Sequence, residues 1–207
     1  MRLVIDYGGV IVHHGEFREQ ATVLGVENER DRRFVALAYV AFREGFVRST
    51  AAYLDLLSTL TGASEAACRA YLDERWLDPE FPAANADTLR ELASDHTLVC
   101  LSNGVRPWIE TVLADHGVRD CFDRLVVSSD LRRSKPHPRG YLECLPEADE
   151  PTAMVSDEYD EDLLMAETLG MASVWVEGDE TPYREPDARI STLADLPALL
   201  DDGFPDR

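Results

Sequence analysis

The sequence predicts an α/β protein with a parallel sheet covered by helices and an all-helical insert after the first strand. Five short apolar runs alternate with amphipathic helical patterns along most of the chain, and this alternation is typical of parallel sheets. Residues 15–83 interrupt the alternation, because they carry helical patterns and no strand signal. The length of 207 residues suits one domain that carries such an insertion.

Each predicted strand is a short apolar run, and four of the five lead into polar residues. The first run, residues 3–6, ends at Asp6 and is followed by Tyr7 and a glycine turn. Ligands bind beyond the carboxyl ends of the strands in sheets of this kind, so the polar residues there are candidate site residues. The other four runs lie at residues 97–101, 125–127, 153–155 and 173–176.

Helical patterns separate these runs and fill the insert. Pro107 suits the first turn of one helix, and Gly117 follows its end. Ser49 and Ser64 precede two helices of the insert and are suitable N-caps. The helices between the strands are predicted at residues 84–93, 107–116, 162–169 and 193–200, and those of the insert at residues 29–42, 51–60 and 65–76.

The charge of the chain excludes several classes of partner. There are 40 acidic and 20 basic residues, and the net charge of −20 argues against binding to nucleic acid or to an anionic membrane surface. No apolar run approaches the ~20 residues of a membrane span. The first residues do not resemble a signal peptide, so a cytoplasmic location is predicted. No particular oligomeric state is predicted.

The basic residues are 19 arginines and one lysine. Heavy acidity with so little lysine predicts a halophilic protein from a cytosol at molar salt, where the Debye length is only ~3 Å and self-repulsion is screened. Codon bias in a GC-rich genome is the alternative explanation for the arginines, but it accounts less well for the acidity.

Two candidate sites consist of only a few residues. Asp6 places a carboxylate at the end of the first strand, where it could act as a nucleophile, a metal ligand or a cap for the next segment. Ser102, Asn103 and Gly104 follow the second run and precede a helix, so their hydroxyl and amide groups could bind an oxyanion. An ordinary turn is the alternative for this triplet.

Two further candidate sites are marked by their charge. Lys135 is the only lysine of the chain, and its compact charge suits a site that balances carboxylates and a phosphate better than the broad fork of arginine. Residues 156–162 hold five acids within seven residues after the fourth run, which suits a hard divalent cation such as Mg²⁺. A solvated acidic loop is the alternative for this segment.

Taken in order along the chain, these residues resemble the haloacid dehalogenase (HAD) superfamily of hydrolases. The matching stretches are LVIDYGGVI, LVCLSNG, SKPHPRGY and MVSDEYDEDLLMAETLGM, and they extend over the chain from end to end. The resemblance is strongest to capped members whose first motif reads D-x-G-x-V. It implies a Rossmann-like core domain formed by residues 1–14 and 84–207 and a helical cap domain formed by residues 15–83.

The resemblance also implies which groups carry the chemistry. Asp6 would attack phosphorus and form an aspartyl-phosphate. The Asp6 carboxylate, the backbone carbonyl of Gly8 and the carboxylate of Asp157 would hold Mg²⁺. The net charge of −20 would repel a phosphate ester, so the site requires a cation and a lysine.

Four other residues would support the reaction by the same resemblance. Ser102 and the Asn103 amide would bind the phosphoryl oxygens. Lys135 would neutralise charge at the site. Asp162 would support the site or orient Lys135.

The chain departs from the common family pattern at three positions. Gly8 stands where most phosphatases of the family have a second aspartate that acts as general acid and base, a role worth roughly 10²–10⁴ in rate. Val10 replaces a common threonine, and Ser156 replaces a glycine or an aspartate. A substitute acid could come from the start of the insert, at His13, His14 or Glu16.

The insert also carries candidate specificity residues. Arg43, Glu44 and Arg48 lie between two of its predicted helices, where an arginine could bind an anionic substrate. A solvated turn is the alternative for this segment.

The sequence therefore predicts a Mg²⁺-dependent phosphatase that acts on a small phosphorylated metabolite. A 2-haloacid dehalogenase is the first alternative, because such enzymes share the fold and the nucleophile and also lack the second aspartate. The acids at residues 157–162 weigh against it, since dehalogenases of the family carry a neutral Ser/Asn-rich stretch there. A HAD-like protein that binds a phosphorylated ligand or a protein partner, with weak or no turnover because of Gly8, is the second alternative.

Overall fold

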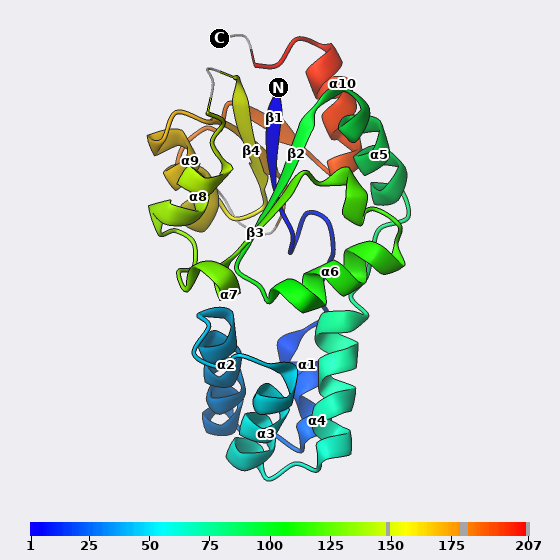
Figure 1. Cartoon of the computed structure of the whole chain (residues 1–207), viewed down its shortest axis with the longest axis vertical. Helices are drawn as coiled ribbons and strands as arrows, with labels where there is room; N and C mark the ends of the chain where they lie inside the picture. Colours follow the sequence, from blue (N-terminus) through cyan, green and yellow to red (C-terminus); the bar gives the residue numbers. More distant parts are fainter. Residues whose placement is uncertain (148–149, 179–181, 206–207) are drawn as a thin grey trace.

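The chain is built on a six-stranded parallel sheet with the strand order β3-β2-β1-β4-β5-β6 (Figure 1). The computed structural model describes residues 1–147, 150–178 and 182–205. β1 lies in the middle of the sheet, between β2 and β4. The predicted parallel α/β fold is therefore confirmed. The strands are β1 (Arg2–Asp6), β2 (Thr97–Ser102), β3 (Arg124–Val127), β4 (Thr152–Ser156), β5 (Ala172–Val176) and β6 (Ala188–Ile190).

The apolar runs form strands because both faces of the sheet are buried. In β1, Leu3 and Ile5 pack into one hydrophobic cluster, whereas Val4 packs into a second cluster on the opposite face. The same alternation holds in β4, where Val155 and Met154 point to opposite faces. Continuous apolar runs are expected for strands that are buried on both sides.

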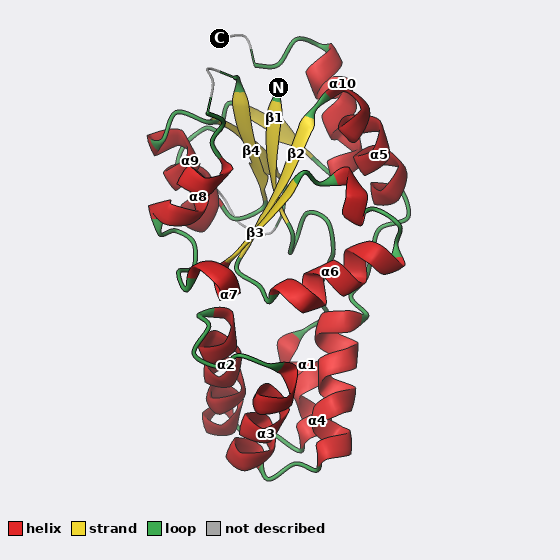
Figure 2. Cartoon of the chain, in the orientation of Figure 1, coloured by secondary structure: helices red, strands yellow, loops and turns green. Residues whose placement is uncertain are grey.

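Helices cover both faces of the sheet (Figure 2). Three of them begin with a proline in the first turn, where the missing N–H is not needed. One face is covered by α5 (Asn85–Asp95), α6 (Arg106–Asp115) and α10 (Leu196–Asp201), and the other by α8 (Pro138–Cys144) and α9 (Leu164–Thr168).

Between β1 and β2 the chain forms a helical segment that lies beyond one end of the sheet (Figure 1). Its side chains, among them Tyr53, Leu57 and Tyr71, form a hydrophobic cluster that also includes Val105 and Trp108 from the part of the chain after β2. Ser49 and Ser64 accept hydrogen bonds from backbone N–H groups as N-caps, as expected. The division into a core domain and a cap domain formed by residues 15–83 stays a prediction. The segment contains α1 (Phe17–Gln20), η1 (Ala21–Leu24), α2 (Glu29–Arg43), α3 (Thr50–Thr61), α4 (Glu65–Leu72) and the π-helical turn η2 (Asp73–Leu77).

The structure adds elements that the sequence patterns do not predict. Most are too short for a periodic pattern, such as β6 with three residues and the helix α7 (Ser128–Leu131) with four. The helix predicted from residue 162 is preceded by a π-helical turn, η4 (Tyr159–Leu163), which carries Asp162. Two 3₁₀ turns complete the fold, η3 (Arg119–Cys121) and η5 (Leu193–Asp195). Within the described ranges, no helix combines the length and the apolar character that crossing a membrane requires.

Candidate active site

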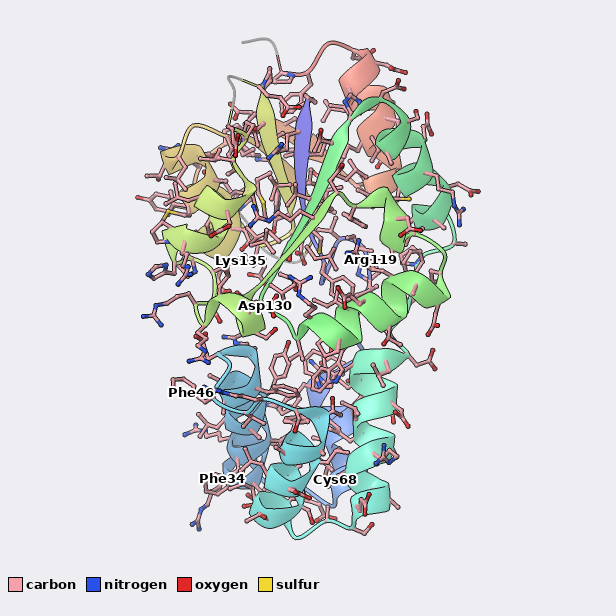
Figure 3. All side chains as sticks on the ribbon, in the orientation of Figure 1. Phe34, Phe46, Cys68, Arg119, Asp130 and Lys135 are labelled. Atoms are coloured by element: carbon pink, nitrogen blue, oxygen red, sulfur yellow. The ribbon has the colours of Figure 1, made fainter. Side chains whose placement is uncertain are left out.

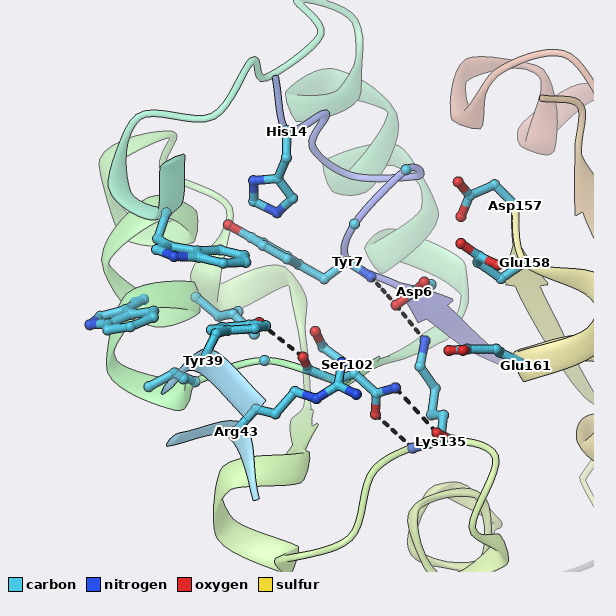
Figure 4. Close-up of a pocket in the computed structure, with 18 of the residues that line it drawn as sticks. Asp6, Tyr7, His14, Tyr39, Arg43, Ser102, Lys135, Asp157, Glu158 and Glu161 are labelled. Atoms are coloured by element: carbon cyan, nitrogen blue, oxygen red, sulfur yellow. Dashed lines mark hydrogen bonds and ion pairs between the residues drawn. The ribbon is translucent and has the colours of Figure 1, made fainter. Parts of the chain in front are cut away.

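The candidate site is a cavity of about 550 Å³ at the carboxyl end of the sheet. Asp6 is the last residue of β1 and Ser102 the last residue of β2, while Asp157 follows β4 directly. Because β2, β1 and β4 are parallel neighbours, these ends meet at one edge. The helical segment supplies the opposite wall with Tyr39 and other residues, so the cavity lies between sheet and insert (Figure 4).

Lys135 lies between two buried carboxylates. Its Nζ atom is 2.8 Å from Asp6 Oδ1 and 2.6 Å from Asp162 Oδ2. The side chains of Lys135, Asp6 and Asp162 are only 6%, 8% and 0% exposed. Figure 3 shows Lys135 beside the sheet, in the half of the molecule that contains the strands. The predicted grouping of these three residues is thus present in the structure.

The surrounding shell holds the two carboxylates in place. The backbone N–H of Tyr7 donates to Asp6 Oδ1 over 2.7 Å, and the Ser156 hydroxyl donates to Asp162 Oδ2 over 2.7 Å. Ser156, a departure from the family pattern, therefore serves as a second donor to Asp162. Lys135 and the Tyr7 N–H both contact Asp6 Oδ1. The other carboxylate oxygen points toward Asp157 and Glu158 (Figure 4).

Burial determines the electrostatics of this group. It raises the pKa of Asp6 to about 8; the ammonium of Lys135 opposes the shift, and the carboxylates of Asp162 and Asp157 add to it. Burial alone would lower the pKa of Lys135, but Asp162 and Asp6 reverse this and hold the pKa above its ordinary value. Lys135 therefore stays charged, and one ammonium faces more negative charge than it can balance.

Asn103 is bound to the backbone of Lys135 by both ends of its side-chain amide. Its Oδ1 accepts from the Lys135 N–H over 2.6 Å, and its Nδ2 donates to the Lys135 carbonyl over 3.3 Å. This arrangement fixes the loop that presents Lys135. The side chain is thereby engaged, so the backbone N–H of Asn103 and the hydroxyl of Ser102, which also lines the cavity, are the groups that suit a phosphoryl oxygen.

Asp157 is the second carboxylate at the strand ends and has an unsatisfied oxygen. Its Oδ1 atom is buried without a hydrogen-bond partner in the described structure. Burial raises the pKa of this carboxyl group. The carboxylate lies against the backbone at Gly9, where a Cβ atom would be 1.9 Å from Asp157 Oδ2. Only glycine permits this approach, which brings Asp157 next to the loop that follows Asp6.

These groups fit a hard divalent cation. Asp6 and Asp157 supply carboxylate oxygens, and Gly8 lines the same cavity with its backbone. Among the described residues, no group of three or more His, Cys, Asp or Glu side chains is arranged to hold a metal ion. A cation here would complete its ligands with backbone oxygen, phosphate and water, which is how Mg²⁺ is commonly bound. The orphaned oxygen of Asp157 and the excess of negative charge both favour this.

His14 occupies the space beside Gly8. A Cβ atom on Gly8 would lie 3.8 Å from His14 Cδ2 and 4.0 Å from His14 Nε2. His14 Nδ1 is 2.9 Å from the Arg75 carbonyl, which accepts only from an N–H, so this contact leaves Nε2 without a proton in the neutral ring. Burial, followed by the charge of Arg75, lowers the pKa of His14 to about 4.

The other candidate residues of the insert separate into two groups. Arg43 lines the cavity, and so does His13, whose side chain is exposed. Glu16 and Arg48 are exposed and do not line it. Glu44 accepts a hydrogen bond from the Ser134 hydroxyl and so connects the insert to the loop of Lys135.

Sequence reasoning did not identify the aromatic wall of the cavity. Tyr39 and Trp76 stack with their ring centroids 4.0 Å apart, and Trp108 continues the stack 6.0 Å from Trp76. The Tyr39 hydroxyl donates to the Asn103 carbonyl over 3.0 Å. No motif marks these residues, because they come from α2, η2 and α6 and meet only in the folded chain.

Known proteins are similar to this chain in sequence and in fold. A model of the haloacid dehalogenase-like hydrolases matches residues 3–170. The chain is also similar to the L-2-haloacid dehalogenase of Xanthobacter autotrophicus, in a structure with chloropropionic acid covalently bound. The TM-score is 0.69 at 18% identity, and the alignment covers 98% of both chains. At this identity the likeness concerns the fold.

Two curated relatives are similar in sequence. A phosphoserine phosphatase of Thermus thermophilus is 29% identical over 153 residues, which cover 70% of this chain and 61% of the relative. The pyrimidine 5′-nucleotidase YjjG of Escherichia coli is 29% identical over 107 residues, which cover 48% of each chain. The match thus spans about three fifths of the first relative and about half of the second.

The parallel sheet, the cluster of Asp6, Lys135 and Asp162 at its carboxyl end and the family match over residues 3–170 lead to one conclusion. The chain belongs to the haloacid dehalogenase-like hydrolases.

Proposed function

We propose that the protein is a Mg²⁺-dependent phosphatase that acts on a small phosphorylated metabolite, with Asp6 as the nucleophile. The observation that carries the proposal is Asp157, a carboxylate with a buried, unpartnered oxygen in the same cavity as Asp6. Five acidic residues line this cavity, and its cations are Arg43, Arg75 and Lys135. Such an excess of carboxylates suits a bound divalent cation.

In the proposed reaction, a carboxylate oxygen of Asp6 attacks phosphorus as the bond to the leaving oxygen breaks. Water then attacks phosphorus of the aspartyl-phosphate, the bond to Asp6 breaks, and phosphate is released with the Asp6 carboxylate regenerated. Lys135 neutralises charge beside Asp6 over 2.8 Å, and Asp162 holds Lys135 in position. Ser102 and the backbone N–H of Asn103 would bind the phosphoryl oxygens. Mg²⁺, held by the carboxylates of Asp6 and Asp157 and the carbonyl of Gly8, would supply electrostatic stabilisation of the phosphoryl group.

The named relatives add independent support. The phosphoserine phosphatase and the pyrimidine 5′-nucleotidase are both named for phosphate ester hydrolysis, and each is 29% identical to this chain over the matched part. Both names point to small phosphorylated molecules, and a cavity of about 550 Å³ is suited to these.

A 2-haloacid dehalogenase is the second candidate. The fold likeness to the Xanthobacter enzyme and the absence of a carboxylate at Gly8 favour it. The charge of the cavity opposes it, because Asp157 and Glu161 would repel both Asp6 and the carboxylate of a haloacid if no cation were bound.

Hydrolysis of p-nitrophenyl phosphate in molar KCl, with Mg²⁺ and then with EDTA, tests the proposal. This ester has a good leaving group, so it needs little help from a general acid. Turnover that depends on Mg²⁺ is the expected result. If the folded protein gives no turnover but releases chloride from 2-chloropropionate, the dehalogenase is the correct assignment.

Asp157→Asn should raise the Mg²⁺ concentration needed for half-maximal activity by about 10-fold or more, because the neutral amide is a weaker ligand for a hard cation. A titration of activity against Mg²⁺ measures this, and the Mg²⁺-dependent rise in melting temperature gives a second readout. Asp160→Asn is the matched control, since Asp160 is an exposed acid of the same segment. An unchanged Mg²⁺ requirement in Asp157→Asn would exclude Asp157 as a ligand.

His14→Gln should slow hydrolysis of the aspartyl-phosphate more than its formation. His14 Nε2 lies 4.0 Å from the position that a Cβ atom on Gly8 would occupy, and it carries no proton in the neutral ring, whose pKa is lowered to about 4. Within the proposed function it therefore acts as a base that takes a proton from the attacking water. We expect steady-state kcat for p-nitrophenyl phosphate to fall about 100-fold, while the first turnover, which releases p-nitrophenolate, keeps its wild-type rate. His116→Gln serves as the control, because His116 is exposed and does not line the cavity. Equal losses in the first turnover and in the steady state would contradict this role.

A further inference from the structure

Arg43 is a cavity residue whose guanidinium forms no ion pair in the described part of the protein. It ends α2 and lines the cavity, and Figure 4 shows its side chain reaching toward Ser102 from the insert. Its Nε atom is buried without a hydrogen-bond partner in the described residues. No carboxylate among those residues forms an ion pair with it. The guanidinium lies over the Tyr39 ring, with Cζ 6.0 Å from the ring centroid, which is a cation–π contact.

Most described arginines that form no ion pair are exposed, and Arg43 and Arg75 are the two that are partly buried. There are 40 acidic residues for 20 basic ones, and arginines elsewhere, such as Arg106 beside Asp130, find acids readily. Arg75, the other arginine of the cavity, donates to the Gly15 carbonyl and to Gln20. Holding a guanidinium partly buried and unpaired costs free energy, so a partner from outside the chain is the simplest explanation for it.

The position of Arg43 is fixed relative to the nucleophile. Tyr39 precedes it by four residues and so lies on the same face of α2. The Tyr39 hydroxyl is bonded to the Asn103 carbonyl, and the Asn103 side chain holds the backbone of Lys135. This chain of contacts aligns the face of α2 that bears Arg43 with the loop that follows β2. Arg43 therefore stands on the insert side of the cavity and Asp6 on the sheet side.

We infer that Arg43 binds a carboxylate of the substrate, so that the preferred substrates are phosphate esters that carry a carboxylate. The inference rests on the proposed function and specifies its substrate class. A guanidinium binds a carboxylate through two parallel N–H donors. A second phosphate would offer similar oxygens, but it would add more negative charge to a cavity that five acids already line. A carboxylate adds a single charge and is favoured for this reason.

Two pairs of esters test the inference. O-phospho-L-serine and O-phosphoethanolamine differ by the carboxylate alone, and 3-phosphoglycerate and glycerol 3-phosphate differ by a carboxylate in place of an alcohol. For the wild-type protein with Mg²⁺ in molar KCl, we expect kcat/KM to be at least about tenfold higher for the carboxylate member of at least one pair. Arg43→Gln should bring this ratio close to one, mainly through KM, and Arg43→Lys should restore part of it.

Arg48→Gln is the matched control. It removes the same charge from the segment that follows α2, but Arg48 is exposed and outside the cavity, so the ratio should stay at its wild-type value. The inference is wrong if the wild type shows no preference in either pair, or if Arg43→Gln weakens both members of a pair equally. The melting temperature of each variant verifies folding, and Arg43→Met replaces Arg43→Gln if the latter does not fold.

Failure of the inference and failure of the proposed function give different results. If the wild type hydrolyses neither p-nitrophenyl phosphate nor any of the four esters, the phosphatase assignment fails. Calorimetric titration of the same four esters then tests Arg43 without turnover. Tighter binding of the carboxylate members that is lost in Arg43→Gln supports the inference, and equal binding of both members overturns it.

Discussion

Asp6→Asn is expected to abolish turnover, with kcat for p-nitrophenyl phosphate at least about 10⁴-fold below that of the wild type. The amide has the shape of the carboxylate but is a very poor nucleophile. Lys135 keeps its contact with Asp162 over 2.6 Å, so the cluster retains a balanced ion pair. A steady-state assay in molar KCl with Mg²⁺ measures the loss. Asp160→Asn, an isosteric change at an exposed acid, should keep wild-type activity.

The same variant should be more stable than the wild type when no metal is present. Burial raises the pKa of Asp6 to about 8 in the folded state from an ordinary value of 3.8, so the unfolded chain releases this proton first as pH rises. The wild type therefore loses stability between about pH 4 and pH 8, and Asp6→Asn is free of this loss. Melting temperatures in EDTA should differ most near pH 8 and converge toward pH 4. Full activity in Asp6→Asn would exclude Asp6 as the nucleophile.

Lys135→Arg is expected to lower kcat/KM by at least about 100-fold although the charge is unchanged. The Lys135 ammonium fits between Asp6 and Asp162 at 2.8 Å and 2.6 Å, and its side chain is 6% exposed. The guanidinium is longer and planar, so it would displace one carboxylate or turn away from both. Kinetics on p-nitrophenyl phosphate and the melting temperature together separate loss of function from loss of fold.

Arg139→Lys is the matched control, because it exchanges the same two residue types in the opposite direction outside the site. Arg139 is exposed at the start of α8, three residues after the proline that follows Lys135, and its replacement should leave the rate within about twofold of the wild type. Wild-type rates in Lys135→Arg would show that any positive charge suffices at this position. The argument that the site needs a compact charge would then be wrong.

The helices and strands that are long enough to show a regular pattern of apolar residues were predictable from the sequence. Five strands are buried on both faces, and this burial demands continuous apolar runs. The helices of the insert carry N-caps such as Ser49 and Ser64, whose short-range hydrogen bonds leave a local signature. β6 and α7 are too short to show any period, so only their tertiary neighbours specify them.

The site residues that follow strands were also predictable. Asp6, Ser102 and Asp157 stand next to strand ends, and the parallel order of β2, β1 and β4 brings them to one edge. Lys135 was identifiable as the only lysine of the chain. Its contact with Asp162, 27 residues away, requires the fold to bring the loop before α8 against η4.

The sequence by itself determined the fold class, the order of the motifs and the residue types at the strand ends, because these depend on local patterns of burial and on turns. The tertiary structure alone decided how the side chains pair. It showed that Asn103 holds the backbone of Lys135, that His14 fills the space beside Gly8, and that Arg43 lacks a carboxylate partner in the described residues. These facts depend on distances between segments far apart along the chain, which no pattern of spacing records.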